Sequence, residues 1–303
     1  RPGGIFVRSA EQISAEDRLL FQSVARVVII DSQGSLLEQL NRRSLSELRM
    51  PRLVPVRRHR PELASAKSAA TAGALLFNGL GGFTPDGSEY RMALAPGQAT
   101  PAPWSNVLAN PNFGTLISES GMAYTWSENA HEFRLTPWHN DPLCDSGGEA
   151  FYLRDEESGH LWSPTPLPVR PPEPCVIRHG FGYSVFETRL DGIVSELTVF
   201  VAMDASVKFS VLKVRNESGR QRRLSATGYV EWVLGDLREK SAMHLSTEIA
   251  SRSGALYAHN PYSTEFSGRV AFFDVDDPMR TVTGDRTEFL GRNGSLQDPA
   301  ALR

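Results

Sequence analysis

Large aromatic and amide side chains gather in one window of the sequence. Four of the five tryptophans lie there, at Trp104, Trp126, Trp138 and Trp162. The polar residues that we single out with them are Asn106, Asn140 and Asp141. An aromatic ring can stack on the apolar C–H face of a sugar, while amide and carboxylate groups hydrogen-bond to its hydroxyl groups. These residues are therefore candidates for binding a neutral carbohydrate.

The same window also has a purely structural interpretation. Trp and Pro side chains can fill the space between two sheets while Asn residues form turns. The window contains Pro103, Pro111, Pro137 and Pro142. Because proline is rare inside strands, we expect long loops or irregular sheet edges here, and functional residues often lie in such loops.

Catalytic and metal-binding patterns are weak. The carboxylates Glu119, Glu128, Asp141, Glu149 and Asp155 could supply an acid, but a general acid needs a cleft that raises its pKa. The seven histidines include no His-x-x-x-His pair, and no Gly-x-Ser-x-Gly motif occurs. We expect no catalytic residue, no metal and no cofactor.

Composition narrows the function classes. The chain has 303 residues and a formal net charge of −3, which argues against a general nucleic-acid binder. The sequence contains no run of 18 apolar residues, which is the length that a membrane-spanning helix needs. The two cysteines, Cys144 and Cys175, suggest reduced thiols, and a bridge between them is the alternative. The chain begins at Arg1 without a leader, so we expect a piece of a longer protein.

The first 70 residues differ from the rest. Residues 14–45 have helical periodicity, with Ser14 as the cap, Leu19, Leu20, Val24, Val27 and Val28 on one face, and a second short helix from Ser35 to Arg43. Residues 49–60 hold five arginines and a histidine between prolines. This strip is either a solvated extended connector or a site for phosphates or anionic lipid. We predict a helical connector and basic linker over 1–70.

Residues 71–303 have the signals of a mainly β domain. Asp191-Gly192 separates two apolar-rich runs, which predicts a hairpin. Residues 222–234 alternate with a period of two, as a half-buried strand does. We expect further strands at 245–250, 254–258, 269–275 and 280–290. Short strands with regular turns predict a large antiparallel β-sandwich preceded by a short helical segment.

Several motifs resemble the amino-terminal part of the family-94 glycoside phosphorylases (glycosyltransferase 36 type). They are PWSNVLANPNFGT at 103–115, ESGMAYTW at 119–126, LTPWHNDP at 135–142, GEAFYLRD at 148–155 and LWSP at 161–164. Within this family these motifs are particularly similar to those of the phosphorylase-like region of cyclic β-1,2-glucan synthases. The resemblance covers roughly residues 20–303, and its most specific part is 78–164.

This resemblance implies a galactose-mutarotase-like supersandwich, followed in the family by a helical linker and an (α/α)6 barrel that carries the catalytic acid. No catalytic residue is transferred to this chain, because it ends before such a barrel could begin. In the family the sandwich continues in strand beyond this point, so the sandwich could be truncated at its carboxy-terminal end. Inorganic phosphate would be a co-substrate of the longer enzyme, not a cofactor held here. The implied partners are a β-glucan oligosaccharide, the barrel of the same polypeptide and a second copy in a homodimer. The implied location is the cytoplasmic side of the bacterial inner membrane, within a membrane-anchored polypeptide.

Three functions remain open. The domain could be a non-catalytic border of a substrate cleft in a glycan-processing enzyme, with the Asn140-Asp141 loop at that border. It could instead be an autonomous carbohydrate-binding module for β-glucans. It could also be a dimerisation module without a ligand, since exposed strand edges favour pairing. We favour the first, with dimerisation as a component of it.

Overall fold

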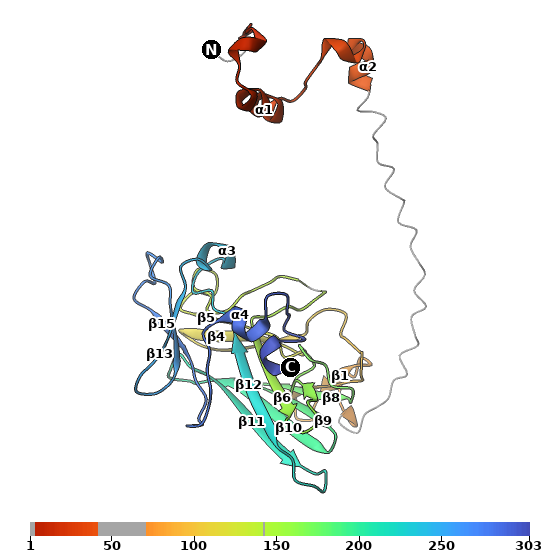
Figure 1. Ribbon diagram of the computed structural model, residues 1–303. Helices are drawn as coiled ribbons and strands as arrows, with labels where there is room; N and C mark the ends of the chain where they lie inside the picture. The colour runs from red at the N-terminus through yellow and green to blue at the C-terminus, as the bar shows by residue number, and fades with distance from the viewer. Residues whose placement is uncertain (1–3, 42–70, 142) are drawn as a thin grey trace. The chain divides into compact units, whose positions relative to one another are not determined.

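The computed structural model describes residues 4–41, 71–141 and 143–303 (Figure 1). The chain divides into two compact units, Arg1–Leu63 and Ala64–Arg303, and each is described by itself. The basic strip 49–60 lies outside the described residues, so its two interpretations stay open. The expected boundary at residue 70 also stays a prediction.

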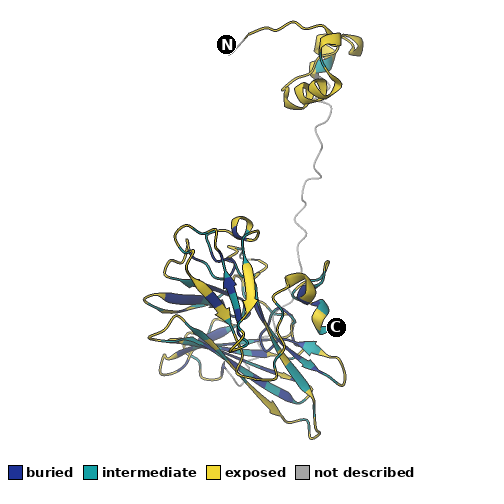
Figure 2. Cartoon of the chain, turned by 60° about the vertical axis from the view of Figure 1, so that its left-hand side comes forward, coloured by how far each residue is buried: buried dark blue, intermediate teal, exposed yellow. Residues whose placement is uncertain are grey.

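The amino-terminal unit contains short helices, as expected. They are η1 (Ala10–Gln12), α1 (Ala15–Val24), η2 (Asp31–Gln33) and α2 (Leu36–Asn41). The hydroxyl of Ser14 accepts a hydrogen bond from the Asp17 N–H at 3.0 Å, which confirms the predicted cap. Because α1 ends at Val24, Val27 and Val28 do not continue its face. No residue of 4–40 is buried (Figure 2), since helices of ten and six residues enclose no core of their own.

The second unit is mainly β, which confirms the expected fold class. Its strands are β1 (Gly81–Phe83), β2 (Glu89–Leu94), β3 (Ser105–Asn110), β4 (Phe113–Ser118), β5 (Ala123–Ser127), β6 (Glu149–Asp155), β7 (Leu161–Trp162), β8 (Cys175–Gly180), β9 (Tyr183–Leu190), β10 (Ile193–Val201), β11 (Lys208–Asn216), β12 (Leu224–Val230), β13 (Ser246–Ile249), β14 (Leu256–His259) and β15 (Val270–Phe273). The short helices are α3 (Arg238–Ser241), α4 (Arg286–Leu290) and η4 (Ala300–Leu302).

These strands form antiparallel sheets that pack face to face. The largest has the order β1-β2-β8-β9-β10-β11, and three-stranded sheets have the orders β3-β4-β5, β12-β6-β7 and β13-β14-β15. Met92, Ile177 and Phe186 of the six-stranded sheet pack against Leu108 and Ile117 of the β3-β4-β5 sheet, and all five side chains are buried. This apolar layer fixes β2, β3 and β8 relative to one another, and these strands carry part of the candidate site.

The hairpin predicted at Asp191-Gly192 is confirmed. Both residues have positive φ, 49° and 76°, which matches the twist of a two-residue hairpin loop. They join β9 to β10 in continuous register from Leu190↔Ile193 to Tyr183↔Phe200.

Three expectations were wrong in detail. Residues 280–290 are not a strand but lead into α4, because the Asp285 carboxylate accepts hydrogen bonds from the N–H groups of Thr287 and Glu288 and starts a helix. The period-two run 222–234 forms a strand only over β12. The window 104–162 is not mainly loop, since β3 to β7 lie within it and only 128–148 is a long connection.

No helix within the described ranges is long and apolar enough to span a bilayer.

Candidate functional site

Two hollows lie on either side of β3, and Ser105 borders both. We call the first the strand pocket; Tyr90, Trp104, Asn106 and His179 line its part on β2, β3 and β8, and it has a volume of about 360 Å3. We call the second the loop pocket; Tyr124, Trp138, Asn140, Asp141 and Asp145 line it, and its volume is about 240 Å3.

Three aromatic rings form one wall of the strand pocket. Phe83 meets Tyr90 edge to face, with ring centroids 5.0 Å apart, and Tyr90 meets Trp104 in the same way at 6.0 Å. Tyr90 and Trp104 pack against the buried apolar layer below. The rings are therefore held at right angles to each other by the sandwich core.

His179 forms hydrogen bonds to two other strands at the strand pocket. Its Nε2 lies 3.3 Å from the carbonyl oxygen of Trp104, and its Nδ1 lies 2.9 Å from the Ser184 hydroxyl. Since a carbonyl can only accept, Nε2 carries the proton and Nδ1 accepts from Ser184. Asn106 donates from Nδ2 to the same hydroxyl at 3.2 Å. Burial lowers the pKa of His179 to about 4, so the imidazole is neutral at pH 7.

Glu119 fixes the backbone of Trp104 from the other side. Its carboxylate accepts from the Trp104 N–H at 2.8 Å, and its own N–H donates to the Trp104 carbonyl oxygen at 2.9 Å. Thr100 also donates to this carboxylate. Burial raises the pKa of Glu119, although these hydrogen bonds oppose the shift. The position of Trp104 is thus set by both its side chain and its main chain.

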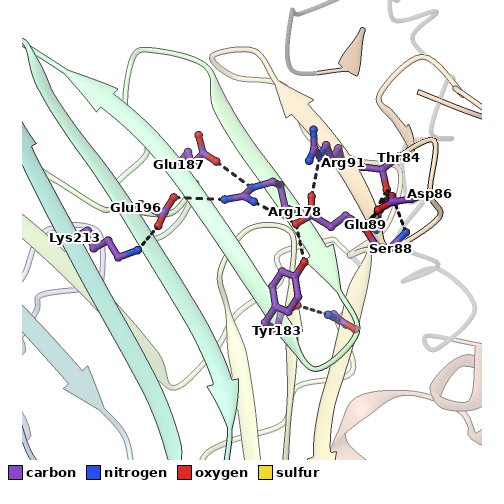
Figure 3. Close-up of polar contacts among 11 residues, drawn as sticks. Thr84, Asp86, Ser88, Glu89, Arg91, Arg178, Tyr183, Glu187, Glu196 and Lys213 are labelled. Carbon is purple, nitrogen blue, oxygen red and sulfur yellow. Dashed lines mark hydrogen bonds and ion pairs between the residues drawn. The ribbon is translucent and has the colours of Figure 1, made fainter. Parts of the chain in front are cut away.

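Glu89 lines the strand pocket and also belongs to a charged network on the six-stranded sheet (Figure 3). The Glu89 carboxylate accepts from the Tyr183 hydroxyl and from Arg91, each at 2.8 Å, and from Arg178 at 3.2 Å. Burial alone would raise the pKa of Glu89, but these donors outweigh it and hold the pKa below its usual value. Arg178 also pairs with Glu187 and Glu196, and Lys213 pairs with Glu196. Three carboxylates therefore face three cations within the network.

The loop pocket is built on a second series of rings. Tyr124 lies between Trp126 and Trp138, with ring centroids 5.2 Å from each. Trp126 covers Gly114, where an added Cβ would lie 2.3 Å from the indole, so a glycine is needed on β4. Trp138 is 38% exposed and presents part of its ring to the pocket.

Two aspartates shape the loop that closes this pocket. The Asp141 carboxylate accepts from the N–H groups of Leu143 at 2.9 Å and Cys144 at 3.2 Å. These backbone hydrogen bonds lower the pKa of Asp141, so it stays ionised and does not suit the role of a general acid. Asp145 accepts from the hydroxyls of Ser118, at 2.6 Å, and Ser120, which attaches the loop to the end of β4.

The structure divides the residues that the sequence singled out. Trp104 and Asn106 lie in the strand pocket, and Trp138, Asn140 and Asp141 lie in the loop pocket. Trp126 lies outside both pocket linings and packs against Tyr124. Trp162 is 2% exposed and packs with Leu153, Leu190 and Ile193 in the core, so it offers no face to a ligand.

Sequence reasoning did not identify Tyr90, Tyr124, His179 or Asp145 as members of these pockets. Tyr124 lies within the ESGMAYTW motif, two residues before Trp126, and could have been found by its place on the same strand face. His179 could not, because its partners Trp104 and Ser184 come from two other strands. Among the described residues no group of three or more His, Cys, Asp or Glu could hold a metal ion.

Comparison with known proteins gives a consistent result. Residues 88–303 match the family described as "Glycosyl hydrolase 94, supersandwich domain". The chain is similar to cyclic beta-(1,2)-glucan synthase NdvB of Rhizobium meliloti (strain 1021), with 40% identity over 75% of this chain and 8% of that protein. It is also similar to N,N'-diacetylchitobiose phosphorylase of Vibrio furnissii, with 30% identity over 73% of this chain and 28% of that protein. Solabiose phosphorylase of Paenibacillus borealis shows 28% identity over 74% of this chain and 30% of that protein. The chain therefore spans less than a third of each of these relatives.

Proposed function

The chain belongs to the glycosyl hydrolase 94 supersandwich domain family, and from this premise we propose that it is the non-catalytic domain of a bacterial enzyme of the cyclic β-1,2-glucan synthase type. In this proposal the loop pocket borders the substrate cleft and contacts a β-glucan oligosaccharide. The observation that carries the proposal is the loop pocket itself, which is lined by Asn140, Asp141 and Trp138, whose partly exposed ring packs against Tyr124 at an interplanar angle of 41°.

This combination suits a sugar. Trp138 supplies a flat apolar surface, and Tyr124 limits its freedom to turn. One oxygen of Asp141 is used by the Leu143 and Cys144 N–H groups, and its second oxygen can accept from a sugar hydroxyl. Asn140 is exposed at the rim, where its amide can both donate and accept.

The catalytic acid is proposed to lie outside this chain, in a barrel domain of the same polypeptide. Asp141 stays ionised, Glu119 is turned toward the Trp104 backbone, and Glu149 is buried against Lys208. None of these carboxylates combines a raised pKa with a position at a pocket surface, as a general acid requires. Inorganic phosphate would then be a co-substrate of the whole enzyme.

The test has two arms. The 303-residue chain, incubated with β-1,2-gluco-oligosaccharides and inorganic phosphate, is expected to release no glucose 1-phosphate, and measurable release would overturn the non-catalytic role. In the longer polypeptide with its barrel, Trp138→Ala is expected to raise KM for the oligosaccharide about tenfold with little change in kcat. Tyr262→Ala, at an exposed aromatic residue outside both pockets, is the control. An unchanged KM in Trp138→Ala would show that the loop pocket does not border the substrate cleft.

We also propose that the domain supports a homodimer through β11. This strand is nine residues long, lies at the edge of the six-stranded sheet, and exposes Phe209 and Val211. A long edge strand with exposed apolar residues is prone to pair with another chain. Light scattering is expected to give a dimeric mass that Val211→Lys reduces to that of a monomer; a monomeric mass of the unchanged chain at high concentration would contradict this.

The location that we propose is the cytoplasmic side of the inner membrane, within a membrane-anchored polypeptide. The similarity to the glucan synthase supports it, as do two cysteines that are both free. Protease protection of the longer polypeptide in spheroplasts tests it, and cleavage of this domain from the outside would contradict it.

A further inference from the structure

We propose that the strand pocket is a second sugar-binding site, which holds one pyranose ring of a neutral glucan chain without help from any other domain. The class of ligand rests on the proposed function. The pocket itself is separate from the loop pocket, and only Ser105 borders both.

The shape of the strand pocket fits a ring-sized ligand. Its volume of about 360 Å3 lies within the range of small-molecule sites. The rings of Phe83, Tyr90 and Trp104 meet edge to face, so they offer two apolar surfaces at an angle. Phe181, at the turn between β8 and β9, is 88% exposed and stands at the rim. A pyranose has apolar C–H faces that such surfaces can cover.

Polar groups in the strand pocket have hydrogen-bonding capacity to spare. The Tyr90 hydroxyl accepts from Asn78 at 3.0 Å, and its own proton has no acceptor within the described part of the chain. Asn106 uses its Nδ2 on Gly180, Tyr183 and Ser184, and among the described residues nothing donates to its Oδ1. Likewise the indole N–H of Trp104 has no acceptor in residues 4–41, 71–141 and 143–303. Sugar hydroxyls both donate and accept, so they can use an acceptor placed beside two donors.

The charges around the pocket select a neutral ligand. Glu89 is the acidic residue of its lining, and Tyr183, Arg91 and Arg178 already occupy its oxygens. His179 uses both ring nitrogens and is neutral at pH 7. A phosphate would find no unpaired cation in this lining, and a uronic acid would face the Glu89 carboxylate. A neutral hexose meets neither problem.

Two of the groups that would contact the sugar are already fixed. The backbone of Trp104 is held by Glu119 and His179, and Asn106 is held by hydrogen bonds of 2.9 Å and 3.0 Å to the backbone of the β8–β9 turn. Binding then orders chiefly the exposed Phe181 side chain, which limits the conformational entropy lost when the sugar binds.

The test is a titration of the 303-residue chain with β-1,2-gluco-oligosaccharides, followed by isothermal calorimetry, with cello-oligosaccharides and inorganic phosphate as comparison ligands. We expect saturable binding of a gluco-oligosaccharide in the millimolar to high-micromolar range and none of phosphate. Phe181→Ala changes an exposed side chain and so leaves folding intact; it should weaken binding about threefold. Trp104→Phe keeps a ring in the core and should weaken binding about tenfold.

Control variants separate this proposal from the proposed function. Tyr262→Ala, outside both pockets, should leave the affinity of the isolated chain unchanged, and Trp138→Ala measures what the loop pocket adds. No saturable binding by the folded chain would overturn the second site. Binding that is lost in Trp138→Ala and kept in Trp104→Phe and Phe181→Ala would also overturn it, while leaving the loop pocket and the proposed function in place. Tight binding of phosphate would exclude the neutral-ligand class.

Discussion

The strand pocket and the loop pocket share Ser105 but are built in different ways. Trp104, Asn106 and His179 come from strands or their ends, and every one of them is hydrogen-bonded to a neighbouring strand or turn. Trp138, Asn140 and Asp141 come from the long connection between β5 and β6. The first part of that connection is held by the buried Phe133 and by bridges of Arg134 to Trp126 and Gly235. The part that carries these three residues is attached chiefly through Asp145 with Ser118 and Ser120 and the packing of Pro137 on Gly148.

This contrast indicates two kinds of recognition in one domain. A pocket on strands keeps its geometry when the domain is alone, because the sheet and core determine it. A pocket on a loop can adjust when a second domain packs against it, as lids and cleft borders do. In the two proposals, the domain holds a glucan by itself at one hollow and completes a cleft with the other.

Protonation of His179, which lies in the strand pocket, should make the stability of the domain depend on pH. The folded pKa of His179 is about 4, whereas an unfolded histidine titrates near 6.5. Between these values the unfolded chain binds one proton more than the folded chain, so the free energy of unfolding falls as pH drops from about 6.5 to about 4. The contribution of His179 to this fall is about 3 kcal/mol.

Urea unfolding of the unchanged chain and of His179→Gln at pH 7 and pH 4 measures this contribution. The loss of stability between the two pH values should be smaller in the variant by about that amount. Equal losses in both chains would show that His179 does not link the pocket to pH.

A substitution at Gly148 should disturb the loop pocket and leave the strand pocket unchanged. A Cβ at this position would lie 2.2 Å from Cδ of Pro137, which directly precedes Trp138. Gly148→Ala is expected to cost about 2 kcal/mol of unfolding free energy and to shift the fluorescence of Trp138. Gly268→Ala, where a Cβ meets no atom within 4 Å, is the matched control and should be neutral. Gluco-oligosaccharide binding at the strand pocket should be the same in both variants.

The smallest expected effect concerns the charge of Asp145. Its φ of 45° is left-handed, and asparagine tolerates that conformation as well as aspartate does. Asp145→Asn therefore keeps the backbone but replaces charge-assisted hydrogen bonds from Ser118 and Ser120 by neutral ones, at a cost of about 1 kcal/mol. Asp191→Asn has a similar φ of 49° in an exposed hairpin and should change stability very little. Among the described residues the Asp191 carboxylate has only an exposed partner, His160 at 3.2 Å, so a cost as large in Asp191→Asn would contradict the role given to the buried Ser118 and Ser120 hydroxyls.

The sequence predicted the fold class and the hairpin at Asp191-Gly192, because alternation and turn residues are local signals. The strand expected at 280–290 was wrong for the opposite reason, since one side chain, that of Asp285, starts a helix in a run without clear periodicity. Leu19, Leu20 and Val24 lie on one helix, as expected, but their side chains are between 57% and 71% exposed. Helical periodicity shows which residues share a face and does not show that anything covers it.

The candidate site was predicted as a set of residue types but not as a geometry. Five of the seven residues that the sequence singled out in the window 104–162 line a pocket, yet the sequence could not separate Trp104 from Trp138 or show that Trp162 is buried. That separation depends on which side of β3 each residue lies and on pairing between strands that are far apart in the sequence. The register of β8 with β9 brings His179 opposite Ser184, and this pairing is what links the imidazole to Asn106.

The unequal environments of the two thiols offer a practical consequence. Cys175 is 4% exposed, and burial raises its pKa to about 12, so it resists alkylation. Cys144 is exposed at the end of the loop that carries Asn140 and Asp141; a hydrogen bond with Asp141 raises the pKa of its thiol and so favours mildly alkaline labelling. A maleimide dye should therefore attach at one place in the unaltered chain. It would report on the loop by fluorescence spectroscopy while leaving the strand pocket unaltered.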